Sequence, residues 1–344
     1  MKKYLILLLV IANLGLGVQG FSAMTKEEKT KLEKQIDDAY EKKDNKKMVT
    51  LITKYVNEFP NNADYLNRLG VLYTNQKNYS EAEKWYLKAI ENGNFTAISN
   101  IAYLYFEKGD YEKSIKYYKE YQKLVDNPDN YLWIAGAYYE MEDYKNAKEW
   151  YLKGSEKGNE RSSIELAKLL ISENNETEAK KFLLKVENGN RAEGLYYLMT
   201  IYYKEKNKGK INELKNKMLE KNKMYQISDE MMLKIGLMLG GERENRLFES
   251  INNTDSLIRI RKYEEAKKEY EKFLEYSFEG NYFLGTMYDE LDNKAEALKY
   301  YKIAYEKGKM GISAYKIGNI YEENNNFIEA KKWYQIGIDL DDSQ

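Results

Sequence analysis

Apolar positions along this chain recur at helical spacing within short segments. Leu66, Leu69, Gly70 and Tyr73 lie three or four residues apart, so they share one face of a predicted helix. After a short polar connection the same spacing appears on a second predicted helix, at Ala82, Trp85, Tyr86 and Ala89. A short connection makes two helices antiparallel neighbours, so this stretch predicts a helical hairpin in which glycine and alanine allow close approach.

The hairpin pattern repeats with a nearly fixed period. If the last large residue of each first helix serves as a marker, the markers are Tyr40, Tyr73, Tyr105, Tyr138, Leu170, Tyr202, Leu239, Tyr288 and Tyr321. The steps between them are 33, 32, 33, 32, 32, 37, 49 and 33 residues. Such a period predicts an all-α solenoid of about eight or nine stacked antiparallel hairpins, with the aromatic stripe as its core.

One step in the series is irregular. Between Leu239 and Tyr288 a glycine pair, Gly240–Gly241, interrupts the helical pattern, and a charged stretch follows. We interpret residues 241–262 as an irregular insertion or hinge between repeat arrays at 25–240 and 263–344. An extra turn in a continuous solenoid is the alternative. The unit with Ile211, Leu214 and Lys215 also departs from the pattern, because it lacks the small residue and the two aromatics.

Two stretches carry a resemblance to a known family. The segment AEKWYLKAIENGNFTAISNIAYLY, from Ala82 to Tyr105, and the segment ALKYYKIAYEKG, from Ala297, resemble tetratricopeptide repeats of the Sel1-like branch. The resemblance covers roughly residues 30 to 340. It implies a right-handed superhelix whose first helices line a concave, partner-binding surface.

The first 20 residues differ from the rest. Lys2 and Lys3 precede an apolar run from Tyr4 to Val18, and small residues allow cleavage after Gly20. This pattern predicts a signal peptide and an exported protein, periplasmic or secreted, whose mature domain is not embedded in a membrane. An uncleaved membrane anchor is the alternative.

The composition limits the chemistry. The 344 residues include no histidine and no cysteine, which excludes histidine bases, thiol nucleophiles, disulfides and the usual zinc ligand sets. No phosphate-binding glycine loop or calcium loop is present. The chain beyond residue 20 has 53 basic and 56 acidic residues, which disfavours a nucleic-acid partner. We therefore expect no enzyme activity, no cofactor and no metal.

A partner surface is expected on the first helices. Tetratricopeptide proteins face their ligands with residues at fixed offsets from the marker, and these offsets select an aromatic and acidic track in this chain. The track consists of Tyr103, Phe106, Glu107, Tyr139, Glu140, Tyr196, Tyr203, Tyr282, Asp289, Glu290, Tyr315 and Glu322. Tyrosine favours interfaces and carboxylates favour a basic partner. The alternative is that these tyrosines cover one another between adjacent hairpins.

Three functions fit this sequence. The leading hypothesis is an exported scaffold that binds an extended protein or peptide, with basic character favoured. The second is an envelope protein that stacks glycan or peptidoglycan rings on the tyrosines. The third is a scaffold tethered to the membrane by an uncleaved N-terminus.

Overall fold

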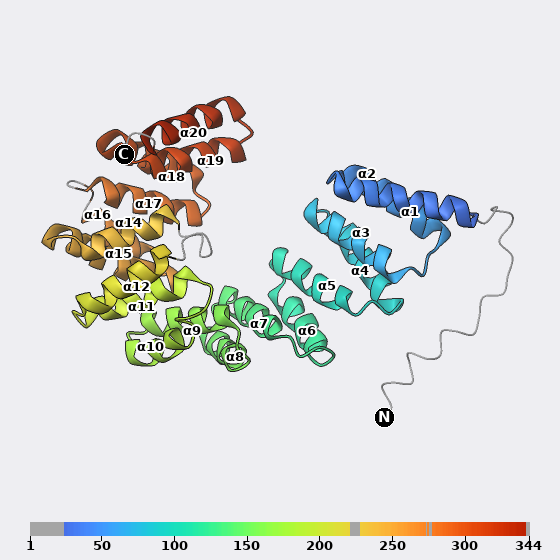
Figure 1. Cartoon of the computed structure of the whole chain (residues 1–344), viewed down its shortest axis with the longest axis horizontal. Coiled ribbons are helices and arrows are strands. Elements are labelled where there is room, and N and C mark those ends of the chain that lie inside the picture. Colours follow the sequence, from blue (N-terminus) through green and yellow to red (C-terminus); the bar gives the residue numbers. More distant parts are fainter. Residues whose placement is uncertain (1–23, 221–227, 273, 275–276, 342–344) are drawn as a thin grey trace. The chain divides into compact units, whose positions relative to one another are not determined.

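The computed structural model describes residues 24–220, 228–272, 274 and 277–341, and these fall into two compact units, the first ending at Val125 and the second beginning at Asp126. The described residues contain nineteen helices and no strand, which confirms the predicted all-helical solenoid of hairpins (Figure 1). The predicted signal peptide, residues 1–20, lies outside this range. None of the described helices is both long enough and apolar enough to span a bilayer.

The first unit contains three successive hairpins. Its helices are α1 (Lys26–Glu41), α2 (Asn45–Glu58), α3 (Ala63–Asn75), α4 (Tyr79–Glu91), α5 (Thr96–Glu107) and α6 (Tyr111–Gln122). They bury one continuous apolar cluster from Leu32 to Tyr105. Each helix is amphipathic, because its buried residues follow the three-and-four spacing of the sequence.

The second unit continues the same construction. Its first helices are α7 (Pro128–Glu140), α8 (Tyr144–Glu156), α9 (Glu160–Ser172), α10 (Glu176–Lys185), α11 (Ala192–Lys204) and α12 (Lys208–Glu220). They are followed by α14 (Asp229–Leu239), α15 (Glu242–Arg259), α16 (Tyr263–Glu271), α17 (Phe278–Glu290), α18 (Lys294–Gly308), α19 (Gly311–Glu323) and α20 (Phe327–Asp341). One apolar cluster runs through the unit from Ala135 to Ile320.

The turns inside the hairpins share one design, although the α15/α16 turn lacks the polar cap. In α3/α4 the amide of Asn78 donates to the carbonyl of Tyr73, and Lys77 takes a left-handed conformation with φ 57°. The side chain of Asn78 then accepts from the amide of Glu81 and caps the second helix. This combines a Schellman ending with an N-cap, so the polar groups of both helix ends are satisfied.

The closing residue of a hairpin, defined here as the one whose carbonyl accepts that turn hydrogen bond, gives a more reliable register than residue size. The closing residues are Ala39, Tyr73, Tyr105, Tyr138, Leu170, Tyr202, Leu257, Tyr288 and Tyr321. Two markers therefore change: Ala39 replaces Tyr40, which is 64% exposed, and Leu257 replaces Leu239.

The stretch interpreted as an insertion holds a regular first helix. Residues 242–259 form α15, which pairs with α16 through a turn at Arg261, where φ is 59°. Gly240 and Gly241 separate α14 from α15, as the glycine pair indicates. The predicted boundaries of the two repeat arrays remain predictions.

Glycine allows close contact in three hairpins. A Cβ atom on Gly70 would lie 2.4 Å from the ring of Tyr86, and the corresponding distances are 2.7 Å for Gly285–Tyr301 and 2.5 Å for Gly318–Tyr334. In each pair the tyrosine follows sixteen residues after the glycine, so it lies at the matching position of the second helix. The tyrosine ring therefore packs directly against the glycine backbone; the close approach predicted at Gly70 is present, whereas the contact of the Tyr86 ring with it was not predicted.

Candidate binding surfaces

We define the first-helix face as the positions two before, one after and two after each closing residue. In the first unit this face includes Tyr103, Phe106 and Glu107 on α5. Tyr103 is 37% exposed, Glu107 is exposed and Phe106 is half-buried. Burial, followed by the hydrogen bond to Glu107, raises the pKa of Tyr103. These predicted partner residues are accessible in the first unit.

The register adds two exposed apolar residues to this face. Tyr40 on α1 takes the position equivalent to Phe106, and Val71 on α3 takes that of Tyr103. They are 64% and 38% exposed. Neither side chain serves the core of its hairpin, so both are available to a partner.

In the second unit, α15 and the turn after it contact the predicted residues of earlier repeats. The hydroxyl of Tyr139 donates to the carbonyl of Arg259 at 2.5 Å, and Arg261 pairs with Glu140 at 2.8 Å. Burial raises the pKa of Tyr139 to about 12. Tyr203 lies edge-on to Phe248, with ring centroids 4.9 Å apart. These residues therefore bind a helix of their own chain.

The other predicted residues of the second unit are divided between core and surface. Tyr196 and Tyr282 are only 4% and 0% exposed, so both side chains belong to the core. Asp289 binds Lys294 at 2.7 Å, and Glu322 accepts a hydrogen bond from Tyr334. The half-buried Tyr315 packs against Gly337, whereas Glu290 is exposed.

A cavity of about 500 Å³ lies among the first helices of the second unit. Side chains from α7, α9, α11, α14, α15, α16 and α17 line it. They are Tyr139, Glu140, Lys168, Tyr197, Glu230, Lys234, Asp255, Ile258, Arg259, Arg261, Tyr263, Tyr270, Phe283, Thr286, Met287 and Glu290. We call it the α15 cavity, because α15 and the adjoining turn supply Asp255, Ile258, Arg259 and Arg261 to its lining.

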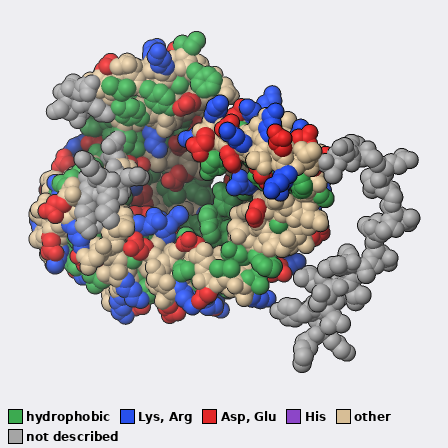
Figure 2. All heavy atoms as spheres, turned by 45° about the vertical axis from the view of Figure 1, so that its right-hand side comes forward, with side chains coloured by type: hydrophobic (Ala, Val, Ile, Leu, Met, Phe, Trp, Pro, Cys, Tyr) green, Lys and Arg blue, Asp and Glu red, His purple; other side chains and the backbone are tan. Residues whose placement is uncertain are grey.

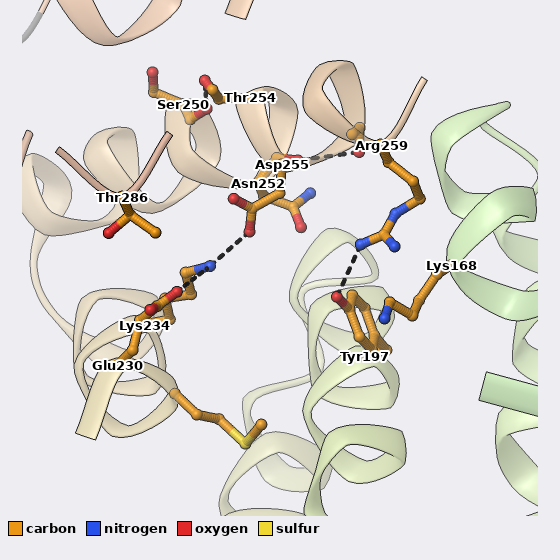
Figure 3. Close-up of polar contacts among 12 residues, drawn as sticks. Lys168, Tyr197, Glu230, Lys234, Ser250, Asn252, Thr254, Asp255, Arg259 and Thr286 are labelled. Carbon is orange, nitrogen blue, oxygen red and sulfur yellow. Dashed lines mark hydrogen bonds and ion pairs between the residues drawn. The ribbon is translucent and has the colours of Figure 1, made fainter. Parts of the chain in front are cut away.

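Several ion pairs fix the walls of the α15 cavity. Lys234 binds Asp255 at 2.7 Å and Glu230 at 3.2 Å, as Figure 3 shows. Lys168 binds Glu193 at 2.7 Å and also pairs with Glu165. The side chains of both lysines are nearly buried, 11% and 13% exposed. In such places paired carboxylates must offset the cost of removing a charge from water.

Three residues of this cavity were predicted from the sequence, but its basic members were not. The predicted Tyr139, Glu140 and Glu290 line it, whereas Lys168 and Arg259 were not predicted. Lys168 lies two positions before Leu170, which is already a marker in the sequence, whereas Arg259 follows from the offsets only once Leu257 replaces Leu239. For Arg259 the concealed signal was the turn after α15, where Lys262 stands in place of the usual capping Asp or Asn.

The site has no arrangement suited to a metal. Within the described ranges, no three metal-ligating side chains converge. The surface charges are also mixed, and Figure 2 shows basic and acidic side chains interspersed over the visible face. The described surfaces therefore offer pairwise ionic and aromatic contacts to a partner.

Four segments match family models described as tetratricopeptide repeat. They are residues 62–91, 95–124, 128–156 and 313–344, and in the structure they correspond to α3/α4, α5/α6, α7/α8 and α19/α20. These segments are tetratricopeptide repeats. Tetratricopeptide repeats form helical scaffolds that typically mediate protein–protein interaction. No curated protein sequence matches the chain.

Two solved structures illustrate the similarity of fold. A MamA protein is 20% identical, with a TM-score of 0.42, covering 47% of this chain and 91% of its own. A tetratricopeptide repeat protein from Parabacteroides merdae is 16% identical, with a TM-score of 0.42, covering 91% of this chain and 99% of its own.

Proposed function

We propose that the protein is an exported, non-catalytic helical-repeat scaffold that binds an extended, basic polypeptide segment. The binding surface is the first-helix face of the first unit. The observation that carries this proposal is the exposure of Tyr40, Val71 and Tyr103, which lie on first helices whose opposite sides are buried. An interface needs such apolar anchors to supply most of its binding energy.

The charges on this face support a basic partner. Its positions carry the exposed carboxylates of Asp37, Glu41 and Glu107, and none of its positions carries a lysine or arginine. A carboxylate beside an exposed aromatic ring favours a lysine or arginine, because the ring attracts the cation as well. An acidic segment would meet only like charge there.

Peptide selection tests the proposal. Unstructured peptides selected from a random display library on the full-length protein should be rich in lysine and arginine. The double variant Tyr40→Ala/Tyr103→Ala should weaken their binding at least tenfold while leaving the melting temperature nearly unchanged. Leu87→Ala is a matched control, because Leu87 is 39% exposed but lies on the second helix α4.

Two results would contradict the proposal. One is a double variant that binds the selected peptides as well as the wild type does. The other is a large loss of stability, which would assign Tyr40 and Tyr103 to packing. Selection of acidic peptides would contradict the basic character of the partner.

Export is a separate part of the proposal. It rests on the predicted signal peptide, and mass spectrometry of the mature protein measures it directly. A first residue of Phe21 supports cleavage and export, whereas an intact Met1 supports the membrane-tethered alternative.

We also infer that the repeats belong to the narrower Sel1-like branch. The inference rests on the junction from Ala82 to Tyr105 and the segment from Ala297. A Sel1-like profile that scores these segments no better than a general tetratricopeptide profile would overturn it.

A further inference from the structure

The first-helix faces of the second unit converge on the α15 cavity. Lys168, Asp255 and Thr286 each lie two positions before a closing residue, while Glu140, Arg259 and Glu290 lie two positions after one. The surface that lies open in the first unit therefore surrounds a cavity in the second, and α15 forms one of its walls. About 500 Å³ is within the range of small-ligand pockets.

Most charges in this cavity neutralise one another. Lys234 binds Glu230 and Asp255, Lys168 binds Glu165 and Glu193, and Arg261 binds Glu140 and approaches Glu142. Two lining groups of opposite sign are left over, Arg259 and Glu290. In the part of the chain that the structure describes, neither forms an ion pair.

Arg259 has unused donors and a fixed position. Its guanidinium donates to the hydroxyl of Tyr197 at 3.0 Å, as Figure 3 shows, and a guanidinium has five N–H donors in all. The hydroxyl of Tyr139 holds the backbone carbonyl of Arg259. Tyr197 accepts the arginine N–H, so its own O–H can point to a ligand. Together they form a preorganised cradle for a carboxylate.

Glu290 is a carboxylate that forms no ion pair with any residue the structure describes. It ends α17 and is exposed to solvent, yet the cavity walls surround it with protein atoms. Burial among these atoms, and then the nearby carboxylates of Asp255 and Glu230, raise its pKa by more than the cations of Lys234 and Arg259 lower it. A ligand cation bound there would relieve this repulsion.

We propose that the α15 cavity binds a short zwitterionic ligand, of the class of free amino acids and short peptides. The ligand carboxylate accepts hydrogen bonds from Arg259 and Tyr197, and the ligand ammonium group forms an ion pair with Glu290. A ligand with both charges completes the pairing of the cavity, whereas an anion or a cation alone leaves one protein charge without a partner. This site is separate from the first-unit surface, so it goes beyond the proposed scaffold function.

Blocked and unblocked peptides test the proposal on the wild-type, full-length protein. The probes are trialanine, its N-acetyl form, its C-amide form, free alanine and inorganic phosphate, and the readout is isothermal titration calorimetry. We expect trialanine or free alanine to bind. Each blocked trialanine should bind at least tenfold more weakly than the free peptide, and phosphate should not bind. Whichever of trialanine and free alanine binds more tightly shows whether the natural ligand is a short peptide or a free amino acid.

Variants assign the two ends of the ligand. Arg259→Gln should abolish the preference for the free carboxylate and keep that for the free amine, and Glu290→Gln should do the reverse. Arg246→Gln on α15 and Glu306→Gln on α18 are matched controls, because both residues are exposed and lie outside the cavity lining. Both controls should bind like the wild type.

The ligand comparison on the wild-type protein remains decisive even if Arg259→Gln fails to fold. Equal binding of free and blocked trialanine would overturn the proposal, and so would the absence of binding by both trialanine and free alanine. Phosphate binding that Arg259→Gln removes would also overturn it, in favour of a simple anion site. Failure of this site would leave the Tyr40 and Tyr103 experiment unaffected.

Discussion

Replacement of Gly285 by alanine tests the close packing of a hairpin. In the structure the added Cβ would lie 2.7 Å from Cδ1 and 2.8 Å from Cε1 of Tyr301. Ordinary contacts of this kind are about 3.5–4.0 Å, so the overlap approaches 1 Å. Tyr301 is 0% exposed and cannot swing into solvent, so α17 and α18 must separate.

The expected magnitude follows from two opposing effects. Overpacking costs about 1–3 kcal/mol, whereas alanine in a helix interior is about 0.5–1 kcal/mol better than glycine. Gly236 in α14 is the matched control, because a Cβ there would meet nothing within 4 Å. Gly236→Ala should therefore gain about 0.5–1 kcal/mol, and Gly285→Ala should be about 1–3 kcal/mol less stable than that control.

Native-state hydrogen exchange, read by mass spectrometry on the α17 and α18 peptides, measures the effect locally. A local readout is needed because repeat arrays often do not unfold in a single step. Tyr301→Leu should partly rescue Gly285→Ala, since α9/α10 carries Ala167 and Leu183 at the matching positions. If Gly285→Ala proved as stabilising as Gly236→Ala, the argument that the tyrosine ring requires glycine would be refuted.

Three further predictions concern other parts of the chain. Trp85→Ala should cost about 3–5 kcal/mol in native-state hydrogen exchange of the α3 and α4 peptides, since Trp85 is only 9% exposed, and a loss below about 1 kcal/mol would show that the register is wrong. Lys262→Asn should gain about 0.5–1 kcal/mol by supplying the missing N-cap of α16, and unchanged hydrogen exchange in α16 would count against the turn design. Burial raises the pKa of Tyr86 and Tyr139 to about 12, from about 10 in an unfolded chain. Because the pKa of these tyrosines is higher in the folded state, their contribution to the free energy of unfolding is fully present below about pH 10 and is lost as the pH rises towards 12. The melting temperature should therefore fall in that pH range. It should fall less in Tyr86→Phe, which cannot ionise at this position. Absorbance titration of the tyrosines checks the assignment, and a single transition near pH 10 in the folded protein would contradict it.

The hairpins were predictable because their signals are local. Helical spacing, small residues opposite aromatic ones and short polar connections each act within about 30 residues, and the structure follows them. Even the degenerate unit keeps Ile211 and Leu214 in the core, both 1% exposed. Hydrophobic burial needs only apolar volume there, so the loss of the aromatic pattern did not change the fold.

The surfaces were harder to predict because they depend on register and on contacts far apart in the sequence. Lys262 in place of a capping Asp or Asn concealed the turn after α15, and the offsets there could not be applied. Tyr196 and Tyr282 carry the right residue type but point into the core, because the offset that selected them lies on the buried side of the helix. Only the structure shows that Tyr139 meets the backbone of Arg259, 120 residues later.

That distant contact has a mechanical consequence. In a simple chain of repeats each hairpin touches only its neighbours, so the array can peel apart one module at a time under tension. The link from Tyr139 and Glu140 to Arg259 and Arg261 closes a loop around the intervening modules. If this part of the chain were pulled from its two ends, the modules between these contacts would resist unfolding together until the contacts broke. The modules would then unfold in one large extension.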